Sequence, residues 1–283
     1  MIRLRVAYAG HDFFSSCLKT LIDRSDIEVV TCLTSGPGKS VDNVLSLAHK
    51  SKIPVLFGRP TRPMVSRLNE SRIDLLISAA YLYRIPIESL TVGRAVNVHP
   101  SLLPEGRGPN PLPYLVDGHR EQCGISIHEM TPEFDMGPIL LQERIPLAES
   151  DGFDQLFLKL FAAAPRLLNT FLDGIDEFFS AKREQGAGSY WPKHDGDQRT
   201  IAAEQAKVGD ALAMHAKFGT VGVIVRLVDG RRIETQRLVA SECEHRYPPG
   251  SVIAQLHIGW IVALTNGLMR VSEPSTLGAP ARS

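Results

Sequence analysis

The sequence predicts an α/β protein in which a doubly wound, mostly parallel sheet is followed by a small C-terminal domain of short strands. Short apolar runs alternate with segments of helical periodicity through the first part of the chain. The run Leu75–Ala79 is apolar except for Ser78, as expected of a central parallel strand buried on both faces. Beyond about residue 200 the pattern changes to short strands separated by turn residues, which predicts a separate small barrel.

Strands and helices of the first domain alternate in chain order. The predicted strands are Leu4–Ala9, Ile27–Leu33, Val55–Phe57, Leu75–Ala79, Ala95–His99, Ile125–His128 and Ile139–Gln142. The predicted helices, with apolar residues at three- and four-residue spacing, are Phe13–Ile22, Val41–Ala48 and Phe153–Phe179. This alternation predicts a Rossmann-like sheet. Only one glycine, Gly10, occupies the first strand-to-helix turn, so the dinucleotide fingerprint G-x-G-x-x-G is absent and a nicotinamide cofactor is not expected.

The predicted domain boundary lies near Thr200, giving a first domain of residues 1–199, whose final part from about 182 is a polar linker, and a second of residues 200–283. The second domain is predicted to begin with a helix over Ala202–Lys217. Two hairpins follow, with turns at Asp229–Gly230 and Asn266–Gly267, both of a type that favours positive φ.

Composition excludes several classes of protein. Lys+Arg and Asp+Glu are equal at 31 each, so no overall field favours nucleic acid or a membrane surface. The four cysteines are scattered without metal-ligand spacing, which predicts reduced, mostly buried thiols and no metal site. No apolar run approaches the ~20 residues of a membrane span, and the N-terminus does not resemble a secretory signal, so the expected compartment is the cytoplasm.

The stretch from Asn97 to Gln142 carries the candidate chemistry. Asn97 and His99 are two apart in an alternating run, so in a strand their side chains point to the same face. Pro100 ends that strand and places His99 at its carboxyl end, where open α/β sheets bind ligands. Asp135 lies in a short connection just before the strand Ile139–Gln142. The prolines and glycines of the intervening loop predict a stiff backbone that approaches a ligand closely.

These residues resemble a known family of enzymes. The runs Asn97-Val98-His99-Pro100-Ser101-Leu102-Leu103-Pro104, Arg107-Gly108 and Asp135-Met136-Gly137-Pro138-Ile139-Leu140 are similar to those of formyltransferases that use 10-formyltetrahydrofolate. That family includes methionyl-tRNA formyltransferases, nucleotide-sugar N-formyltransferases and, more distantly, glycinamide ribonucleotide transformylase. Weaker similarity extends over nearly the whole chain, and the C-terminal segments resemble the family's OB-like domain.

The resemblance implies an enzyme that transfers a formyl group through a tetrahedral intermediate. Asn97 would donate a hydrogen bond to the oxyanion, His99 would handle the amine proton, and Asp135 would orient His99. A lone histidine before a proline is more often a turn residue, and D-x-G alone is usually a turn, but their combination favours the functional interpretation. His128 remains open between a site residue and a structural hydrogen-bonding residue.

The resemblance also implies two binding regions and no metal. The predicted donor-binding residues are Tyr81, Leu82, Tyr83, Arg84, Ile85, Asp135, Met136, Gly137 and Pro138. The predicted acceptor-binding residues are His11, Asp12, Ser101, Arg107 and Gly108. For Asp12 and His11 a helix-capping role is equally compatible with the sequence. Arg107 is equally compatible with binding an acidic group and with lying in solvent.

The preferred acceptor is the amine of a small molecule, such as a nucleotide-linked amino sugar or a hydroxyornithine-type siderophore precursor. The basic loop that methionyl-tRNA formyltransferases insert after the second strand is not evident in Thr34–Asp42, and residues 207–283 carry only a weak excess of positive charge. Transfer to methionyl-tRNA is the alternative. Hydrolysis of formyltetrahydrofolate is less favoured because no regulatory domain precedes the first strand. The Asn97, His99 and Asp135 set argues against a non-catalytic binding module.

Overall fold

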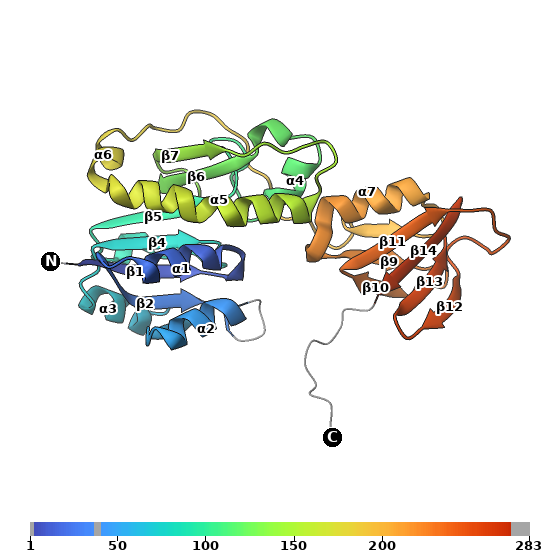
Figure 1. Ribbon diagram of the computed structural model, residues 1–283, viewed down its shortest axis with the longest axis horizontal. Coiled ribbons are helices and arrows are strands. Elements are labelled where there is room, and N and C mark those ends of the chain that lie inside the picture. Colours follow the sequence, from blue (N-terminus) through green and yellow to red (C-terminus); the bar gives the residue numbers. More distant parts are fainter. Residues whose placement is uncertain (1–2, 37–40, 273–283) are drawn as a thin grey trace, which may run out of the picture. The chain divides into compact units, whose positions relative to one another are not determined.

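The computed structural model describes residues 3–36 and 41–272. The chain divides into two compact units, one formed by residues 1–147 and 157–192 and the other by residues 148–156 and 193–283 (Figure 1). Each unit has its own sheets and core. Among the described residues, no helix combines the length and the apolar character needed to span a membrane.

The first unit contains a seven-stranded sheet with the order β3-β2-β1-β4-β5-β6-β7 (Figure 1). The strands are β1 (Leu4–Gly10), β2 (Ile27–Thr34), β3 (Val55–Phe57), β4 (Leu75–Ala79), β5 (Arg94–His99), β6 (Gly124–Glu129) and β7 (Ile139–Arg144). The first five are parallel, whereas β6 is antiparallel to both β5 and β7. The predicted doubly wound, mostly parallel sheet is therefore confirmed, and β4 is buried at every position as its apolar run predicted.

The helices of this unit are α1 (Ser15–Asp23), α2 (Asp42–Lys50), α3 (Arg62–Glu70), α4 (Leu112–Val116), α5 (Phe153–Asp173) and α6 (Ile175–Ser180). The prediction of one helix over Phe153–Phe179 is wrong at its end, because Gly174 adopts a non-helical conformation between α5 and α6. Glycine destabilises a helix by about 1 kcal/mol relative to alanine, which favours a break there. In the apolar stripe of α5, Leu160, Leu168 and Phe171 are buried in the core, whereas Phe157 and Phe161 are half-buried.

The second unit contains a three-stranded sheet, β10-β9-β8, and a four-stranded antiparallel sheet, β11-β14-β13-β12. Their bounds are β8 (Thr200–Ala202), β9 (Val223–Arg226), β10 (Arg232–Thr235), β11 (Arg237–Glu242), β12 (Val252–Leu256), β13 (Gly259–Ala263) and β14 (Gly267–Ser272). One apolar core draws buried residues from both sheets and from helix α7 (Val208–Phe218). The predicted division of domains at residue 200 stays a prediction.

Two local expectations for the second unit are wrong. The helix predicted from Ala202 begins at Val208, because Thr200–Ala202 pairs with β9 as a strand. The turn at Asn266–Gly267 does not need positive φ, unlike Gly230 in the other hairpin, which has φ +83°. Asn266 instead uses its side chain: its Oδ1 accepts a hydrogen bond from the Val208 N–H at 2.8 Å and so caps α7.

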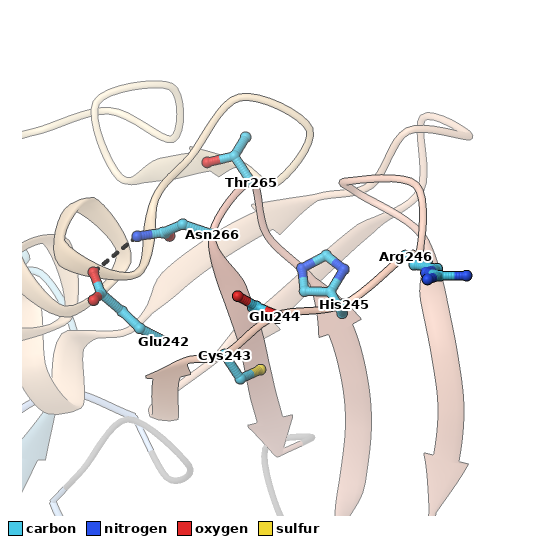
Figure 2. A pocket seen from close by; sticks show the side chains of 7 residues that line it. All are labelled: Glu242, Cys243, Glu244, His245, Arg246, Thr265 and Asn266. Atoms are coloured by element: carbon cyan, nitrogen blue, oxygen red, sulfur yellow. Dashed lines mark hydrogen bonds between the residues drawn. The ribbon is translucent and has the colours of Figure 1, made fainter.

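The thiols differ in accessibility. Cys17, Cys32 and Cys123 are buried, whereas Cys243 is exposed and lines a surface pocket with Glu242 and the residues that follow it (Figure 2). Burial raises the pKa of both Cys17 and Cys32 to about 12, because an apolar interior disfavours the charged thiolate.

We expect a disulfide reagent such as dithiobis-nitrobenzoate to modify one thiol rapidly in the folded protein, since only a thiolate attacks the reagent. All four cysteines should react after denaturation in guanidinium. The Cys243→Ser variant should lose the rapid phase entirely. A rapid phase that persists in this variant would show that a buried thiol is accessible.

Candidate active site

Strand β5 supplies two of the predicted catalytic residues. Asn97 and His99 lie on the same face of β5, and His99 is only 4% exposed at the end of the strand. The following proline, Pro100, leads into a loop that folds back onto the imidazole, and His99 Nε2 lies 2.8 Å from the carbonyl oxygen of Gly106. That oxygen can only accept, so Nε2 carries the proton and Nδ1 is left as the unprotonated nitrogen.

Strand β6 brings a third polar side chain to the site. The antiparallel register pairs Asn97 with His128, whose side chain is almost fully buried. His128 Nδ1 donates to the Glu129 carbonyl oxygen at 2.9 Å, which leaves Nε2 to accept from the Asn97 amide at 3.1 Å. His128 thus fixes the orientation of the Asn97 amide, a role that the sequence alone had left open.

Asp135 lies between these side chains. Its Oδ1 is 3.6 Å from His99 Nδ1, 3.6 Å from His128 Nε2 and 3.4 Å from Asn97 Nδ2, while its Oδ2 accepts the Gly108 N–H at 2.9 Å. Asp135 has φ +56°, a left-handed conformation that aspartate tolerates better than most residues. The structure therefore gathers Asn97, His99 and Asp135 into one cluster.

Burial and charge oppose each other in this cluster. Burial lowers the pKa of His99 below its ordinary value of 6.5, and the Asp135 carboxylate, which raises it, does not fully compensate. His99 is therefore neutral at pH 7. Burial would raise the pKa of Asp135, but the charge on a protonated His99 and the contacts with His128 and Gly108 outweigh it and lower that pKa well below 3.8. A neutral base thus faces a fixed negative charge.

The loop after β5 is held from inside the protein. Ser101 is fully buried, and its hydroxyl donates to the Glu105 carbonyl oxygen at 2.7 Å. Gly106 and Gly108 have positive φ, as the expected stiff loop requires, but their backbone is approached by Trp191: a Cβ on Gly106 would lie 2.5 Å from the indole ring, and one on Gly108 would lie 2.4 Å from the Trp191 carbonyl oxygen. The close approach in this structure is thus to another part of the chain.

Residues 183–192 form this second part, which we call the strap. At one end Arg183 forms an antiparallel bridge with Ile139, and at the other Tyr190 forms a parallel bridge with Arg107. The Trp191 N–H also donates to the Arg107 carbonyl oxygen at 2.7 Å. The segment expected to be a polar linker is therefore hydrogen-bonded across the site-forming loops.

Arg107 does not lie in solvent, one of the two environments considered for it. Its side chain is 7% exposed, and Nε and Nη2 donate to Gln185 Oε1 at 3.1 and 2.9 Å. A further hydrogen bond of 3.0 Å reaches the Gly186 carbonyl oxygen. Burial against neutral acceptors replaces the expected solvent exposure, and the proposed contact with an acidic acceptor group stays a prediction.

The turn after β1 places His11 and Asp12 next to helix α2. The Asp12 carboxylate accepts the backbone N–H groups of Asn43 at 3.2 Å and Val44 at 2.9 Å. Asp12 therefore caps a helix, although it is the next helix along the chain and not the one that follows Asp12 directly. Its role in binding an acceptor, and that of half-buried His11, stay predictions.

The loop predicted to bind the donor leaves β4 at Ala80, which has φ +59°. Tyr81 and Ile85 belong to an apolar cluster that also includes Met130, at the start of the loop that carries Asp135. Leu82 is 57% exposed, and Arg84 pairs with Glu88 at 2.9 Å. The outer residues of this loop thus remain available to a ligand, whereas Tyr81 and Ile85 anchor it.

The opposite side of the predicted donor region is the segment that follows Asp135. Met136 is 46% exposed, while Gly137 and Pro138 are buried. A Cβ on Gly137 would lie 1.9 Å from the Glu129 carbonyl oxygen, so only glycine fits there. The glycine of the D-x-G motif is therefore explained by packing against the end of β6.

The pocket around Cys243 in the second unit does not resemble a metal centre, although two glutamates, a cysteine and a histidine follow one another there (Figure 2). His245 is bound to the Leu264 carbonyl oxygen at 2.9 Å, and Glu242 accepts from Asn266 at 2.8 Å. Within residues 3–36 and 41–272, no group of three His, Cys, Asp or Glu side chains is arranged to hold a metal ion.

Asn97 and His99 from β5 and Asp135 from the connection between β6 and β7 form one polar cluster at the edge of a Rossmann-like sheet, and comparison with known proteins gives the class of enzyme. The profile of the formyl transferase family matches residues 57–172. The methionyl-tRNA formyltransferase of Ehrlichia chaffeensis is 35% identical over 206 residues, which cover 67% of each chain. That of Xanthomonas oryzae pv. oryzae is 28% identical and covers 95% of this chain and 91% of its own.

A solved sugar N-formyltransferase from Shewanella sp FDAARGOS_354 superposes with a TM-score of 0.64 at 18% identity, covering 83% of this chain and 97% of that one. This likeness extends the agreement in fold beyond the sequence relatives. The chain belongs to the 10-formyltetrahydrofolate-dependent formyltransferase family, as its motifs predicted.

Proposed function

We propose that this formyltransferase moves the formyl group of 10-formyltetrahydrofolate to the amine of a small molecule. The observation that carries the proposal is the cluster at the end of β5, in which the Asp135 carboxylate lies 3.6 Å from the His99 imidazole and 3.4 Å from the Asn97 amide. No covalent enzyme intermediate is needed, because the acceptor amine is itself the nucleophile.

The cluster suits the two demands of formyl transfer. When the amine attacks the formyl carbon, the carbonyl oxygen becomes an oxyanion that needs a hydrogen-bond donor. Asn97 has one N–H engaged by His128 and another in a long 3.4 Å contact with Asp135, and this second N–H is the one that the oxyanion would take. The amine proton passes to His99 Nδ1, and the imidazolium that forms is stabilised by Asp135. As the tetrahedral intermediate collapses, the donor nitrogen leaves and takes the proton from the imidazolium, which returns His99 to its neutral form.

The donor region fits a flat, polar ring system. Phe134, Met136 and Leu82 are 62%, 46% and 57% exposed, unusual values for large apolar side chains. Exposed apolar side chains provide surfaces on which a pterin can stack. Residues 81–85 and 134–138 would hold the pterin, and Asp135 would then lie beside the formyl group.

The charges of the described residues favour a small acceptor. Three arginines of the second unit pair with carboxylates of the same unit: Arg226 pairs with Glu204 at 2.8 Å and Arg231 with Asp229 at 2.8 Å, while Arg232 lies 3.5 Å from Asp197. A surface that binds several phosphates needs unpaired cations. The stretch Thr34–Asp42, where a basic loop was sought, includes residues 37–40, which lie outside the described residues.

Methionyl-tRNA is the second candidate acceptor. The sequence relatives in Xanthomonas oryzae and Ehrlichia chaffeensis carry the name methionyl-tRNA formyltransferase, and the first of them matches nearly the whole chain. The solved Shewanella neighbour, by contrast, is a sugar N-formyltransferase. The choice therefore rests on the acceptor assay.

The test is to supply 10-formyltetrahydrofolate with a panel of nucleotide-linked amino sugars, hydroxylated diamino acids and methionyl-tRNA, and to follow the folate absorbance. We expect turnover with a small amine and little change in kcat/KM between 50 and 200 mM salt. If tRNA is the acceptor, kcat/KM should fall by about 10³-fold or more over that range, because phosphate contacts release counterions. Formate release without any amine would indicate hydrolysis instead.

A further inference from the structure

Gln185 is a half-buried residue of the strap that was not among the predicted site residues. Its side-chain Nε2 donates to the Asp135 carbonyl oxygen at 2.9 Å and to the Gly137 carbonyl oxygen at 2.6 Å. Its Oε1 accepts both the Nε and Nη2 hydrogen bonds of Arg107. Carbonyl oxygens only accept and a guanidinium only donates, so the orientation of this amide is fixed by its partners.

Two of these four hydrogen bonds reach the backbone of the loop that carries Asp135, and the other two join Gln185 to the Arg107 guanidinium. The two carbonyl groups that Gln185 contacts flank Met136, and the first belongs to Asp135 itself. Asp135 has φ +56°, a conformation that is strained for an L-residue and persists only where the surroundings hold it. Gln185 supplies that hold from a separate part of the chain.

Arg107 strengthens the arrangement. Arg107 is buried, with only 7% of the residue exposed. Among the residues that the structure describes, its side chain bonds to the neutral acceptors of Gln185 and Gly186 and forms no ion pair with a carboxylate. Its charge is directed onto Gln185 Oε1, which polarises the amide and strengthens the hydrogen bonds donated by Nε2. The adjacent residue, Gly108, donates its N–H to the Asp135 carboxylate. Residue 108 therefore holds the side chain of Asp135 directly, whereas Arg107 acts on its backbone through Gln185.

We propose that Gln185 is a positioning residue for the transfer reaction: together with Arg107 it holds the Asp135 loop so that the carboxylate faces His99 and the Gly108 N–H. This inference rests on the proposed function only for its kinetic consequence. The positioning itself is a property of the loop and is measurable without substrate.

Two variants separate the two ends of the amide. Gln185→Met is uncharged and close in size but makes none of the four hydrogen bonds. Gln185→Glu keeps the acceptor for Arg107 and sets a carboxylate oxygen against the carbonyl groups of Asp135 and Gly137. We expect both to lower kcat by about 10- to 100-fold, as a shift of about 1 Å in a catalytic group does. Gln198→Glu, at an exposed glutamine bound only to Asp195, is the matched control and should match the wild type.

A double-mutant cycle distinguishes positioning from general destabilisation. In an Asp135→Asn background, Gln185→Met should cause little further loss of kcat, because its effect passes through the carboxylate. Full additivity of the two losses would overturn the proposal. So would a Gln185→Met enzyme that folds cooperatively and retains wild-type kcat.

The measurement that does not depend on activity is the titration of the His99 imidazole, followed by NMR. Asp135 raises the pKa of His99, so moving the carboxylate away in Gln185→Met should lower the pKa further, while Gln198→Glu should leave it unchanged. An unchanged His99 titration in the Met variant would overturn the positioning role. A lowered pKa in a protein that transfers no formyl group would support positioning and reject the proposed function.

Discussion

The His99→Ala variant should lose at least about 10²-fold in kcat, and up to about 10⁴-fold if His99 carries the whole proton transfer. The imidazole is buried, its Nε2–H is engaged by the Gly106 carbonyl oxygen, and its free Nδ1 is turned toward Asp135. No other described contact of Asp135 provides an unengaged nitrogen, because His128 Nε2 accepts from Asn97. Single-turnover kinetics with the acceptor that the panel assay identifies would measure the loss in the chemical step.

The matched control is His49→Ala, which removes an exposed histidine from the last turn of α2. It should retain wild-type kcat. Because His99 must be neutral to accept a proton, wild-type kcat/KM should rise with pH through a midpoint below 6.5 and then level off. Wild-type turnover in His99→Ala would remove this residue from the mechanism.

The Asp135→Asn variant should lose about 10²- to 10³-fold in kcat and also change its pH dependence. The amide keeps the shape of the carboxylate and can still accept the Gly108 N–H, so the loss reports the charge. That charge stabilises the imidazolium formed on His99 as the amine proton is transferred. Without it, the proton-transfer step has a higher barrier although the substrates still bind.

The sign of the pH shift follows from the two opposing influences on His99. Burial lowers its pKa and the Asp135 charge raises it, so removing the charge lowers it further. The rising limb of kcat/KM should therefore move to lower pH in Asp135→Asn, at a reduced plateau. A limb that moves to higher pH would contradict the assignment of His99 as the base. Asp23→Asn, which breaks an exposed pair with Lys19, should leave both kcat and the profile unchanged.

Local sequence patterns were sufficient to predict the strands of the sheet and the two site residues on β5. The run at Leu75–Ala79, interrupted only by Ser78, predicted a fully buried strand because a parallel strand covered on both faces consists mostly of apolar residues. The alternation at Asn97 and His99 predicted a shared face because side chains in a strand repeat every two residues. Element ends were less well predicted, since Gly174 divides the long helix and Thr200–Ala202 is a strand.

The remaining site contacts depended on long-range register and on the strap. Nothing in the sequence near His128 specifies that β6 runs antiparallel to β5 and sets this histidine opposite Asn97. Asp12 was recognised as a possible cap, but its partners lie more than thirty residues away in α2. No sequence motif around Gln185 predicted a role for it. The adjacent aromatic residues Tyr190 and Trp191 indicated that the strap packs against the protein, and in the structure Tyr190 bridges Arg107 and Trp191 stacks on Tyr114.

The sequence by itself determined the fold class and the chemical family and predicted Asn97, His99 and Asp135 as the candidate site, because periodicity and short motifs are local properties of a chain. The tertiary structure decided which of these side chains carry protons, which is neutral and what holds them in place. Those properties depend on burial and on hydrogen bonds between segments far apart in the chain, such as the one from Gln185 to the Asp135 backbone. The sequence alone therefore does not give the burial of these side chains or their hydrogen-bond partners, because both arise only when the segments pack together.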